Sequence, residues 1–588
     1  MIACTRDCYD TCVFDQNYRP IRDFPFNGFT CSRGNSDLKR NDLNRVNNPV
    51  IEGKEVDLKT AVTYLVKELK KTKISEVIHV DYDGNQGLLT WYFPARLWNV
   101  LGAVTTDYSI CSSEGHKALS MHYGTSFGAL PEDFANQKAF VFWGSEASVS
   151  FIHGWFLAKD KYKVTIDVRI SETARKSDRY FIIKPSSDAY LAVGIIKLLS
   201  KKFKIDDNLL NFVERFSMDQ IVSITGLSEG EIEEIAGIYS EMSPLTVLGF
   251  ALGRTLNGGE AIRLISLISH IIGKGRKGFF YSNTYGWGID FDYLRGTHEH
   301  SPSRVVGMAE VGKEVEEGKL KFMFVWNSNP IHSLPGADRI VDAVREGGLF
   351  LVVHDPFWSE TAKLANVVIP ASTFLEKHDV VYSYWHQFLV YNAPIRQPKG
   401  VTEVELMREI SKELGINERC LTEDEWDAID YAIRNTGVTL TQLKEKGLAK
   451  MIPHYLEKFS ITPLPEKLIP PEEKLLVYGG HPNYTNSQFK EIYGDREAVI
   501  YNSEYEGEGY LITEKGEVRV TFRKGNLPKG VFFAYKNFLF DKEGRPINSL
   551  SSWEKGKYGG TPLLNYTKII GVRIEERKEE PKIVGDSL

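Results

Sequence analysis

The sequence predicts an α/β protein of several domains, in which two pseudo-duplicated, doubly wound parallel-sheet subdomains lie between a cysteine-rich N-terminal lobe and a C-terminal β-barrel-like domain. Three observations support this prediction. A strand–helix–strand pattern occurs twice, at 139–169 and 322–355; four of the six cysteines lie in the first 31 residues; and short strands replace helices after about residue 470. A chain of 588 residues is also too long for one hydrophobic core, so several subdomains are expected.

The composition is that of an ordinary soluble globular protein, with 42% hydrophobic and 26% charged residues. The net charge of −6 gives no reason to expect binding to nucleic acid or to an anionic membrane. No apolar run approaches the roughly 20 residues that a membrane-spanning helix needs. The first cysteine is Cys4, which leaves no room for a cleaved leader, so we expect a cytoplasmic protein with reduced thiols.

The N-terminal cysteines have the spacing of metal-cluster ligands. Three residues separate Cys4 from Cys8 and Cys8 from Cys12, and Cys31 follows after eighteen more. Four-cysteine ligation is the usual arrangement for a [4Fe–4S] cluster. A structural zinc site is the main alternative, although zinc ribbons usually use two short paired knuckles, and disulfides are a weaker third. The sequence predicts a cluster lobe at residues 1–50.

The next elements begin the first α/β subdomain. Residues 58–71 have apolar side chains at helical spacing, with Asp57 as a plausible N-cap. Residues 76–82 predict a short strand that ends in a glycine-containing turn at 83–87. Glycines at a strand end let backbone amides approach a ligand closely, but a plain turn explains them equally well.

The two copies of the strand–helix–strand pattern each carry an acid near the end of the second strand. In the first copy, the strands are predicted at 139–145 and 164–169, and Asp167 lies near the end of the second. In the second copy, strands at 322–330 and 349–355 flank a helix near 337–346, and Asp355 ends the second strand. Ligands bind beyond the carboxyl ends of parallel strands, where such an acid can hold a ribose hydroxyl. The absence of G-x-G-x-x-G after the first strands disfavours NAD or FAD. Two nucleotide-like sites are predicted, with a ligand-free sheet as the alternative.

These motifs together resemble the molybdenum or tungsten bis-pyranopterin oxidoreductases of the dimethyl sulfoxide reductase family. The cysteine pattern ends in C-x-R-G at Arg33, as in that family, and residues 355–370 match its D-x-F-x-x-E-T-A segment. The first copy matches W-G-x-N, I-D-x-R and R-P-G-x-D less completely. The departures from the family pattern are Glu146, Lys184, Ser186 and Asn366.

The resemblance implies a bis-molybdopterin guanine dinucleotide cofactor that carries Mo or W, with one dinucleotide in each α/β subdomain. The implied cluster domain is 1–50. The first α/β subdomain is discontinuous and consists of 51–110 and 315–420, and the second consists of 111–314. Residues 421–469 form a connecting segment, and 470–588 form the barrel-like domain. The implied cofactor-binding residues are Arg33, Asn85, Trp143, Gly144, Ser145, Asp167, Arg169, Asp188, Gly253, Arg254, Asn327, Asn329, Asp355, Thr361, His481, Ser487, Gln488 and Asn565.

By the same resemblance, Cys111 ligates the metal, with Ser109 as the alternative ligand. Ser112 follows Cys111, where formate dehydrogenases of the family have a histidine, which argues against formate as the substrate. His116 is a candidate for catalytic proton transfer, although a supporting role fits it equally well. Cys420 is expected to pack as a small hydrophobic residue.

The implied activity is two-electron chemistry on a small substrate, with electrons relayed through the cluster to a ferredoxin or an iron–sulfur electron-transfer subunit. Two alternatives use the same scaffold. One is a redox-silent hydratase, and the other is a non-catalytic iron–sulfur subunit that lacks the pterin.

Overall fold

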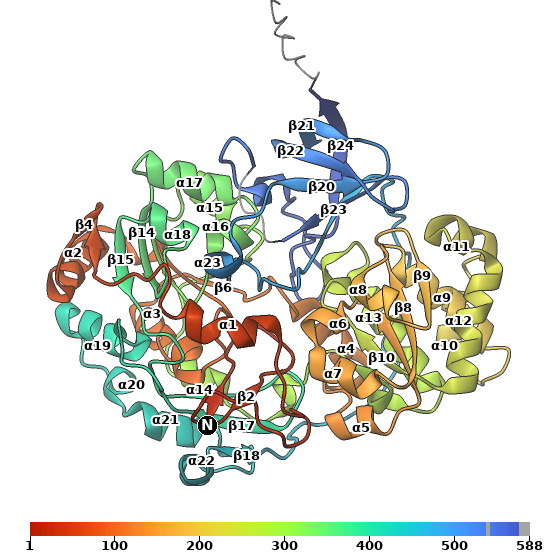
Figure 1. Cartoon of the computed structure of the whole chain (residues 1–588), viewed down its shortest axis with the longest axis horizontal. Coiled ribbons are helices and arrows are strands. Elements are labelled where there is room, and N and C mark those ends of the chain that lie inside the picture. The colour runs from red at the N-terminus through yellow and green to blue at the C-terminus, as the bar shows by residue number, and fades with distance from the viewer. Residues whose placement is uncertain (537–540, 576–588) are drawn as a thin grey trace, which may run out of the picture.

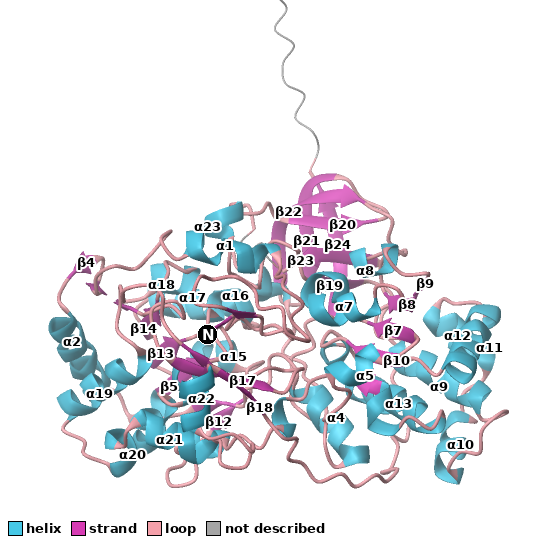
Figure 2. Ribbon diagram, turned by 60° about the horizontal axis from the view of Figure 1, so that its bottom comes forward, coloured by secondary structure: helices cyan, strands magenta, loops and turns pink. Residues whose placement is uncertain are grey.

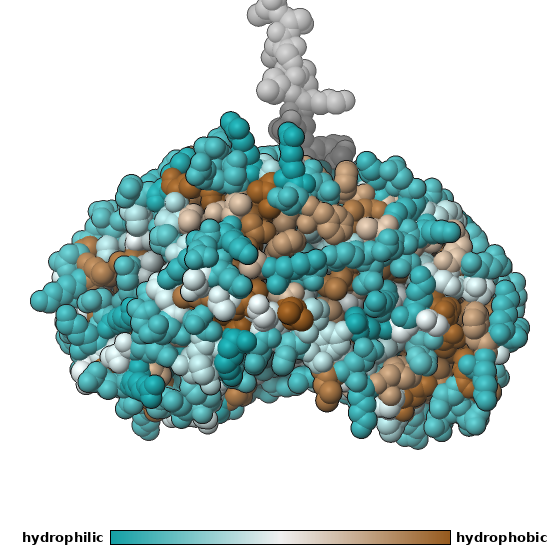
Figure 3. Space-filling view, turned by 90° about the horizontal axis from the view of Figure 1, so that it is seen from below, coloured by the Kyte–Doolittle hydropathy of each residue, from teal (hydrophilic) through white to brown (hydrophobic). Residues whose placement is uncertain are grey.

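The computed structural model describes residues 1–536 and 541–575. Figure 1 shows two α/β lobes side by side, with β14 and β15 in one and β8 and β10 in the other, and the barrel strands above them. Helices flank the strands of both lobes (Figure 2). The face seen from below is mostly hydrophilic, with scattered apolar groups and an indentation between the lobes (Figure 3). Within the described residues, no helix combines the length and the apolar character that crossing a membrane requires.

The first lobe contains a six-stranded sheet in the order β4-β3-β15-β14-β13-β5, and β5, β13, β14 and β15 are parallel. The predicted strands at 76–82 and 349–355 are confirmed, and the strand predicted at 322–330 is confirmed as far as Trp326, since Pro330 begins a helix. The strands are β3 (Val50–Ile51), β4 (Lys54–Glu55), β5 (Val77–Asp81), β13 (Phe322–Trp326), β14 (Phe350–Asp355) and β15 (Val367–Pro370). The main helices are α2 (Leu58–Lys71), α3 (Ala95–Leu101), α15 (Val311–Glu316), α16 (Pro330–Ser333), α17 (Ala337–Arg345), α18 (Glu360–Leu364) and α19 (Glu403–Leu414).

Helix α2 begins as predicted. The Asp57 carboxylate accepts the backbone N–H of Thr60 at 2.8 Å, which satisfies one of the free donors of the first turn. The apolar stripe of α2 is buried at Ala61, Val62, Leu65, Val66 and Leu69. Burial of this stripe fixes the helix against the sheet of the first lobe.

The second lobe contains a five-stranded parallel sheet in the order β11-β10-β7-β8-β9. Its strands are β7 (Ala139–Trp143), β8 (Tyr162–Asp167), β9 (Arg179–Ile182), β10 (Leu245–Leu248) and β11 (Phe279–Phe280). Its helices are α4 (Ser113–Tyr123), α5 (Pro131–Ala135), α6 (Ala147–Ser150), α7 (Ile152–Ala158), α8 (Glu172–Arg175), α9 (Asp188–Leu199), α10 (Asp207–Val213), α11 (Met218–Thr225), α12 (Glu229–Met242) and α13 (Gly258–Ile271). Both copies of the predicted strand–helix–strand pattern are therefore present, each in its own sheet.

The N-terminal lobe lies between the two α/β lobes. It contains β1 (Ile2–Ala3), β2 (Val13–Phe14) and α1 (Ser32–Arg40), and it packs on a three-stranded sheet of β16 (Asp379–Val381), β17 (Phe388–Asn392) and β18 (Leu448–Lys450). The Asp10 carboxylate accepts the backbone N–H groups of Ile152 and His153 in the second lobe. The Thr11 hydroxyl donates to Gln86 in the first lobe. The cysteine loop thus joins the two lobes.

The segment that follows the first lobe is helical, with α20 (Arg419–Thr422), α21 (Glu425–Ala432) and α22 (Leu440–Lys446). The predicted domain boundaries stay a prediction. Strand β12 (Val305–Val306), inside the range 111–314, pairs with β6 (Thr105–Thr106) of the first subdomain.

The C-terminal strands close into a barrel in the order β19-β23-β20-β22-β21-β24, as the sequence predicted. They are β19 (Leu475–Gly479), β20 (Val499–Asn502), β21 (Gly507–Thr513), β22 (Gly516–Lys524), β23 (Val531–Tyr535) and β24 (Thr567–Ile574). Residues 537–540 and 576–588 of the predicted domain lie outside the described residues. The loop after β19 carries α23 (Lys490–Tyr493), which contacts α1 and brings the barrel onto the N-terminal lobe.

The ends of β7 and β10 approach so closely that position 249 has no room for a side chain. A Cβ on Gly249 would lie 1.7 Å from the carbonyl oxygen of Gly144. We expect Gly249→Ala to lower the free energy of unfolding by about 2 kcal/mol, because the strand ends must separate. Urea denaturation of the purified protein measures this loss.

Gly237→Ala is the matched control. A Cβ there, within α12, meets nothing within 4 Å, so the change should stabilise the protein by about 0.5 to 1 kcal/mol through helix propensity. Equal stability of the Gly249→Ala variant and the wild type would contradict the close approach.

Candidate functional site

Two cavities, of about 260 Å³ and about 230 Å³, lie beneath the barrel and the N-terminal lobe. The first follows the carboxyl ends of β5, β13 and β14, and the second follows those of β7, β8 and β10. Both cavities therefore occupy the position where open parallel sheets bind ligands. Their linings share Asp7, Cys111, Arg254, Tyr478, Asn486, Lys536 and Asn565, so the cavities meet at Cys111.

Most of the predicted cofactor-binding residues line these cavities. The first cavity is lined by Asn85, Asn327, Asn329, Asp355, Ser487 and Gln488, the second by Arg33, Gly144, Ser145, Asp167, Arg169, Asp188 and His481, and both by Arg254 and Asn565. These residues lie close together because the carboxyl ends of the strands of both sheets face the same junction. The barrel closes the opposite wall with residues 478–488, Lys536 and Asn565.

Three predicted cofactor-binding residues lie behind the cavity walls. The Trp143 indole N–H donates to Asp188 at 2.8 Å, and the Thr361 hydroxyl donates to Asn329 at 2.6 Å. Gly253 sits against Glu114, whose Cβ would be 3.2 Å from a Cβ at that position. Trp143 and Thr361 therefore orient side chains that line the cavities, and Gly253 lets the backbone pack closely.

His116, the predicted proton-transfer residue, also lies outside both linings. It is buried, its Nδ1 is 2.6 Å from the Ser126 hydroxyl, and Tyr281 and Tyr285 pack edge-on against its ring. Burial lowers the pKa of His116 to about 3, which keeps the ring neutral at ordinary pH.

The four N-terminal cysteines gather within electrostatic range of one another, with Cys4 and Cys12 buried and Cys8 and Cys31 partly exposed. Burial raises the pKa of Cys4 to about 11. Burial acts in the same direction on Cys31, but the guanidinium groups of Arg33 and Arg6 outweigh it and lower the pKa of that thiol. Within residues 1–536 and 541–575, no three of the four cysteine sulfurs lie within 4.8 Å of one another.

Arg33 connects the cysteine lobe with the second cavity. Its guanidinium donates to the carbonyl oxygen of Val149 at 2.9 Å and to that of Tyr484 at 3.1 Å. It also interacts electrostatically with Cys8 and Cys31. Arg33 therefore bridges the thiols, the second lobe and the barrel.

The junction at Cys111 combines a buried thiol with groups of both charges. Burial, with a contribution from Asp7, raises the pKa of Cys111 to about 12, whereas Arg254 and Lys536 act to lower it. Burial lowers the pKa of Lys536 to about 8. Ser109, the alternative metal ligand, lines neither cavity and donates its hydroxyl to Asp107 at 2.6 Å.

Charged cavity residues that the sequence motifs did not indicate include Asp7, Asp83 and Lys536, and Tyr384, which the sequence placed only near a possible entrance funnel, also lines the second cavity. The Tyr384 hydroxyl donates to Asp7 at 3.3 Å and to Asp83, and burial raises the pKa of both carboxyls. Asp7 lies between two predicted cluster cysteines, and Asp83 is the first residue of the predicted turn. Both could therefore have been predicted as site residues from these neighbours. Lys536 follows a barrel strand and has no motif around it.

Comparison with known proteins gives a consistent result. The family model described as molybdopterin oxidoreductase matches residues 45–402. The probable oxidoreductase YoaE of Bacillus subtilis (strain 168) is 28% identical over 389 residues, which are 61% of this chain and 56% of that protein. The probable oxidoreductase YyaE of the same organism is 26% identical over 566 residues, or 86% of this chain and 82% of that protein.

Among solved structures, acetylene hydratase from Pelobacter acetylenicus superimposes with a TM-score of 0.72 at 16% identity. The match covers 93% of this chain and 94% of that chain. At this identity the likeness shows a shared fold.

The buried acids of the cavities give a pH dependence that can be tested at Asp188. Burial raises the pKa of Asp188 to about 6 from 3.8, although the Trp143 hydrogen bond favours the carboxylate. The folded protein therefore binds this proton more tightly than the unfolded chain, and stability is lost as pH rises from about 4 through about 6. Two pKa units correspond to about 3 kcal/mol.

We expect cofactor-free Asp188→Asn protein to gain stability relative to the wild type, by up to about 3 kcal/mol, as pH rises across this window. Urea titrations at pH 4, 5, 6 and 7 measure the difference. The exposed Asp219→Asn variant is the control and should follow the wild type at each pH. A constant difference between Asp188→Asn and the wild type would show that the carboxyl titrates normally.

Proposed function

The chain belongs to the molybdopterin oxidoreductase family, and we propose that it is a molybdenum- or tungsten-dependent oxidoreductase that acts on a small substrate at a bis-molybdopterin guanine dinucleotide centre. The N-terminal cysteines Cys4, Cys8, Cys12 and Cys31 would hold one [4Fe–4S] cluster, which would supply single-electron transfer. The observation that carries the proposal is the pair of cavities, one in each α/β lobe, that meet at Cys111.

The cavity walls fit two dinucleotide ligands. Asp167 and Asp355 stand at corresponding strand ends, where an acid can hold a ribose hydroxyl. Arg254 Nε and one carboxylate oxygen of Asp83 are buried and have no hydrogen-bond partner within the described residues. Buried polar groups are normally paired, so these atoms are consistent with walls that a bound ligand completes.

When bound, the pterin–metal group supplies the two-electron chemistry, and the protein supplies orientation and electrostatics. Cys111 provides a soft thiolate ligand at the junction of the cavities. Arg254 and Lys536 place positive charge beside that thiolate. Asp7, Tyr384 and Asp83 form a hydrogen-bonded group that can hold or pass a proton beside the junction.

The cysteine lobe fits a cluster better than a zinc ion. A tetrahedral zinc site with bonds of about 2.3 Å requires sulfur atoms about 3.8 Å apart. No three of the four N-terminal cysteine sulfurs of the described chain are within 4.8 Å of one another, a separation wider than a zinc site needs and compatible with a cluster. Arg33 lines the second cavity and interacts electrostatically with Cys8 and Cys31, so it would lie between the cofactor and the cluster if both were bound.

Free cysteines as cluster ligands favour a reducing compartment, and we infer that the protein works in the cytoplasm. A single cluster needs an external electron partner. A ferredoxin or an iron–sulfur electron-transfer subunit meets this need.

A hydratase that uses no electron acceptor is the second candidate. The observation that favours it is the fold shared with acetylene hydratase. Turnover that proceeds without any electron acceptor would identify a hydratase. A third candidate is an electron-transfer subunit without pterin. Such a subunit would not need two cavities that meet at a thiol.

Elemental analysis of natively expressed protein, with an absorption spectrum before and after dithionite reduction, tests the proposal. We expect about four iron atoms and one Mo or W per chain. Iron alone would support the electron-transfer subunit, and the absence of both iron and Mo or W would overturn the proposal.

The metal ligand can be identified without knowing the substrate. We expect Cys111→Ser to change the electron paramagnetic resonance signal of the one-electron-reduced metal, because an oxygen ligand replaces sulfur, and to lower the metal content about tenfold or more. Ser109→Ala is the control and should keep both the signal and the metal content. The reverse pattern would assign the ligand to Ser109.

A further inference from the structure

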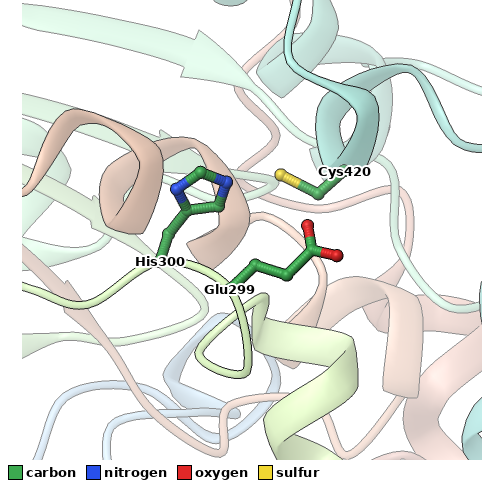
Figure 4. Close-up of side chains that lie close together, drawn as sticks. All are labelled: Glu299, His300 and Cys420. Atoms are coloured by element: carbon green, nitrogen blue, oxygen red, sulfur yellow. The ribbon is translucent and has the colours of Figure 1, made fainter.

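A second group of metal-ligating side chains lies away from both cavities. Glu299, His300 and Cys420 each offer one ligand atom, and these atoms lie within 4.8 Å of one another. Figure 4 shows the imidazole of His300 and the carboxylate of Glu299 directed toward the sulfur of Cys420. We propose that these three side chains bind one zinc ion, which joins two segments that are about 120 residues apart in the sequence. The proposal does not depend on the redox function.

The donor set is typical of zinc rather than of a hard cation. Zinc binds cysteine thiolate, histidine nitrogen and glutamate oxygen in tetrahedral sites, whereas calcium and magnesium prefer oxygen ligands. Three protein ligands leave the fourth position for water. Glu299 is exposed, so water reaches that position from its side of the site.

The ligand atoms are available for coordination. Cys420 is only 5% exposed and is unoxidised, and His300 is half-buried. The His300 ring and the Cys420 sulfur face each other and the Glu299 carboxylate, which also lies 3.6 Å from Nε2 of His298. The sequence analysis expected Cys420 to pack as a hydrophobic residue, and it does border the apolar core. That packing alone does not explain why an imidazole and a carboxylate converge on the same sulfur.

Arg96 holds both ligand-bearing segments in place. Its guanidinium donates to the carbonyl oxygen of Cys420 at 2.8 Å and to that of Leu294 at 3.0 Å, near the end of α14 (Phe291–Arg295). The chain then turns at Gly296, whose carbonyl accepts the N–H of His300 at 3.0 Å. These contacts position the ligands before a metal binds, which reduces the entropy that binding must overcome.

Charge near the site also suits a cation. Arg96 is paired with Glu423, so its positive charge is largely neutralised. Glu418, two residues before Cys420, is a further exposed carboxylate. A bound zinc ion would therefore be surrounded by more negative than positive side chains.

The test uses the full chain and compares each variant with the wild type, so that any zinc on the N-terminal cysteines is the same in both. Protein washed with a chelator is incubated with Zn²⁺, passed through a desalting column and analysed for zinc. We expect the wild type to hold one zinc per chain more than Cys420→Ser. Absence of zinc from the wild type, or equal zinc in both proteins, would overturn the proposal.

Glu299→Gln provides an independent variant at an exposed position, where misfolding is not expected. It should weaken zinc binding about tenfold or more, because it removes a ligand. Glu418→Gln removes the same charge from the neighbouring surface and should bind zinc as the wild type does. If Glu299→Gln and Glu418→Gln bound zinc with equal affinity, the loss of affinity would come from surface charge alone. That result would overturn the three-ligand site.

Cobalt gives a spectroscopic readout. We expect Co²⁺ to produce a thiolate charge-transfer band in the wild type that is absent from Cys420→Ser. The far-ultraviolet circular dichroism spectrum of each variant shows that it has folded. A cobalt–thiolate band that survives in Cys420→Ser would place the ion on another cysteine and contradict the site.

Discussion

The rest of the site depends on one constraint, which is that charged groups are removed from water at the junction of the two cavities around Cys111. Two carboxyls, a thiol, a guanidinium and an ammonium group meet there. Asp83 and Cys111 are buried, and Asp7, Arg254 and Lys536 are partly buried. This burial shifts the pKa values of the acids and the thiol upward and that of Lys536 downward. Burying charge without full pairing costs stability, so such a junction persists only when the surrounding structure holds it. The sheet of the second lobe provides part of that support, since the ends of its strands β7 and β10 meet without room for a side chain at Gly249.

The lobes alone would leave this junction open, and two other parts of the chain close it. The cysteine loop joins both lobes through Asp10 and Thr11, which places Asp7 and the thiols over the junction. The barrel contributes Lys536 and Asn565 from the opposite side. Residues from four separate stretches of sequence therefore define one site, and the charge balance at Cys111 exists only after all four have assembled.

Sequence patterns were sufficient to predict the lobes but only part of the junction, namely Cys111, Arg254 and Asn565. The Asp57 cap of α2, the strands that end near Asp167 and Asp355, and the barrel could be predicted because each depends on neighbouring residues and on hydrophobic periodicity. Lys536 could not be predicted, because its position is set by packing between distant segments. For the same reason Trp143 and Thr361 have the predicted motif neighbours but lie one layer behind the wall, bonded to residues that line it.

The departures from the family pattern make the two halves unlike each other. Both oxygens of the Glu146 carboxylate are engaged, one by the Arg169 guanidinium at 2.6 Å and the other by Thr173. The negative charge of Glu146 also contributes to the raised pKa of Asp167, after burial, while Arg169 opposes it. In the first lobe, the corresponding strand end carries Asn327 and Asn329, which are neutral and bond to Asn85 and Glu360. Two chemically identical dinucleotides would therefore meet different charge in the two cavities, and this difference can set which half holds its ligand more tightly.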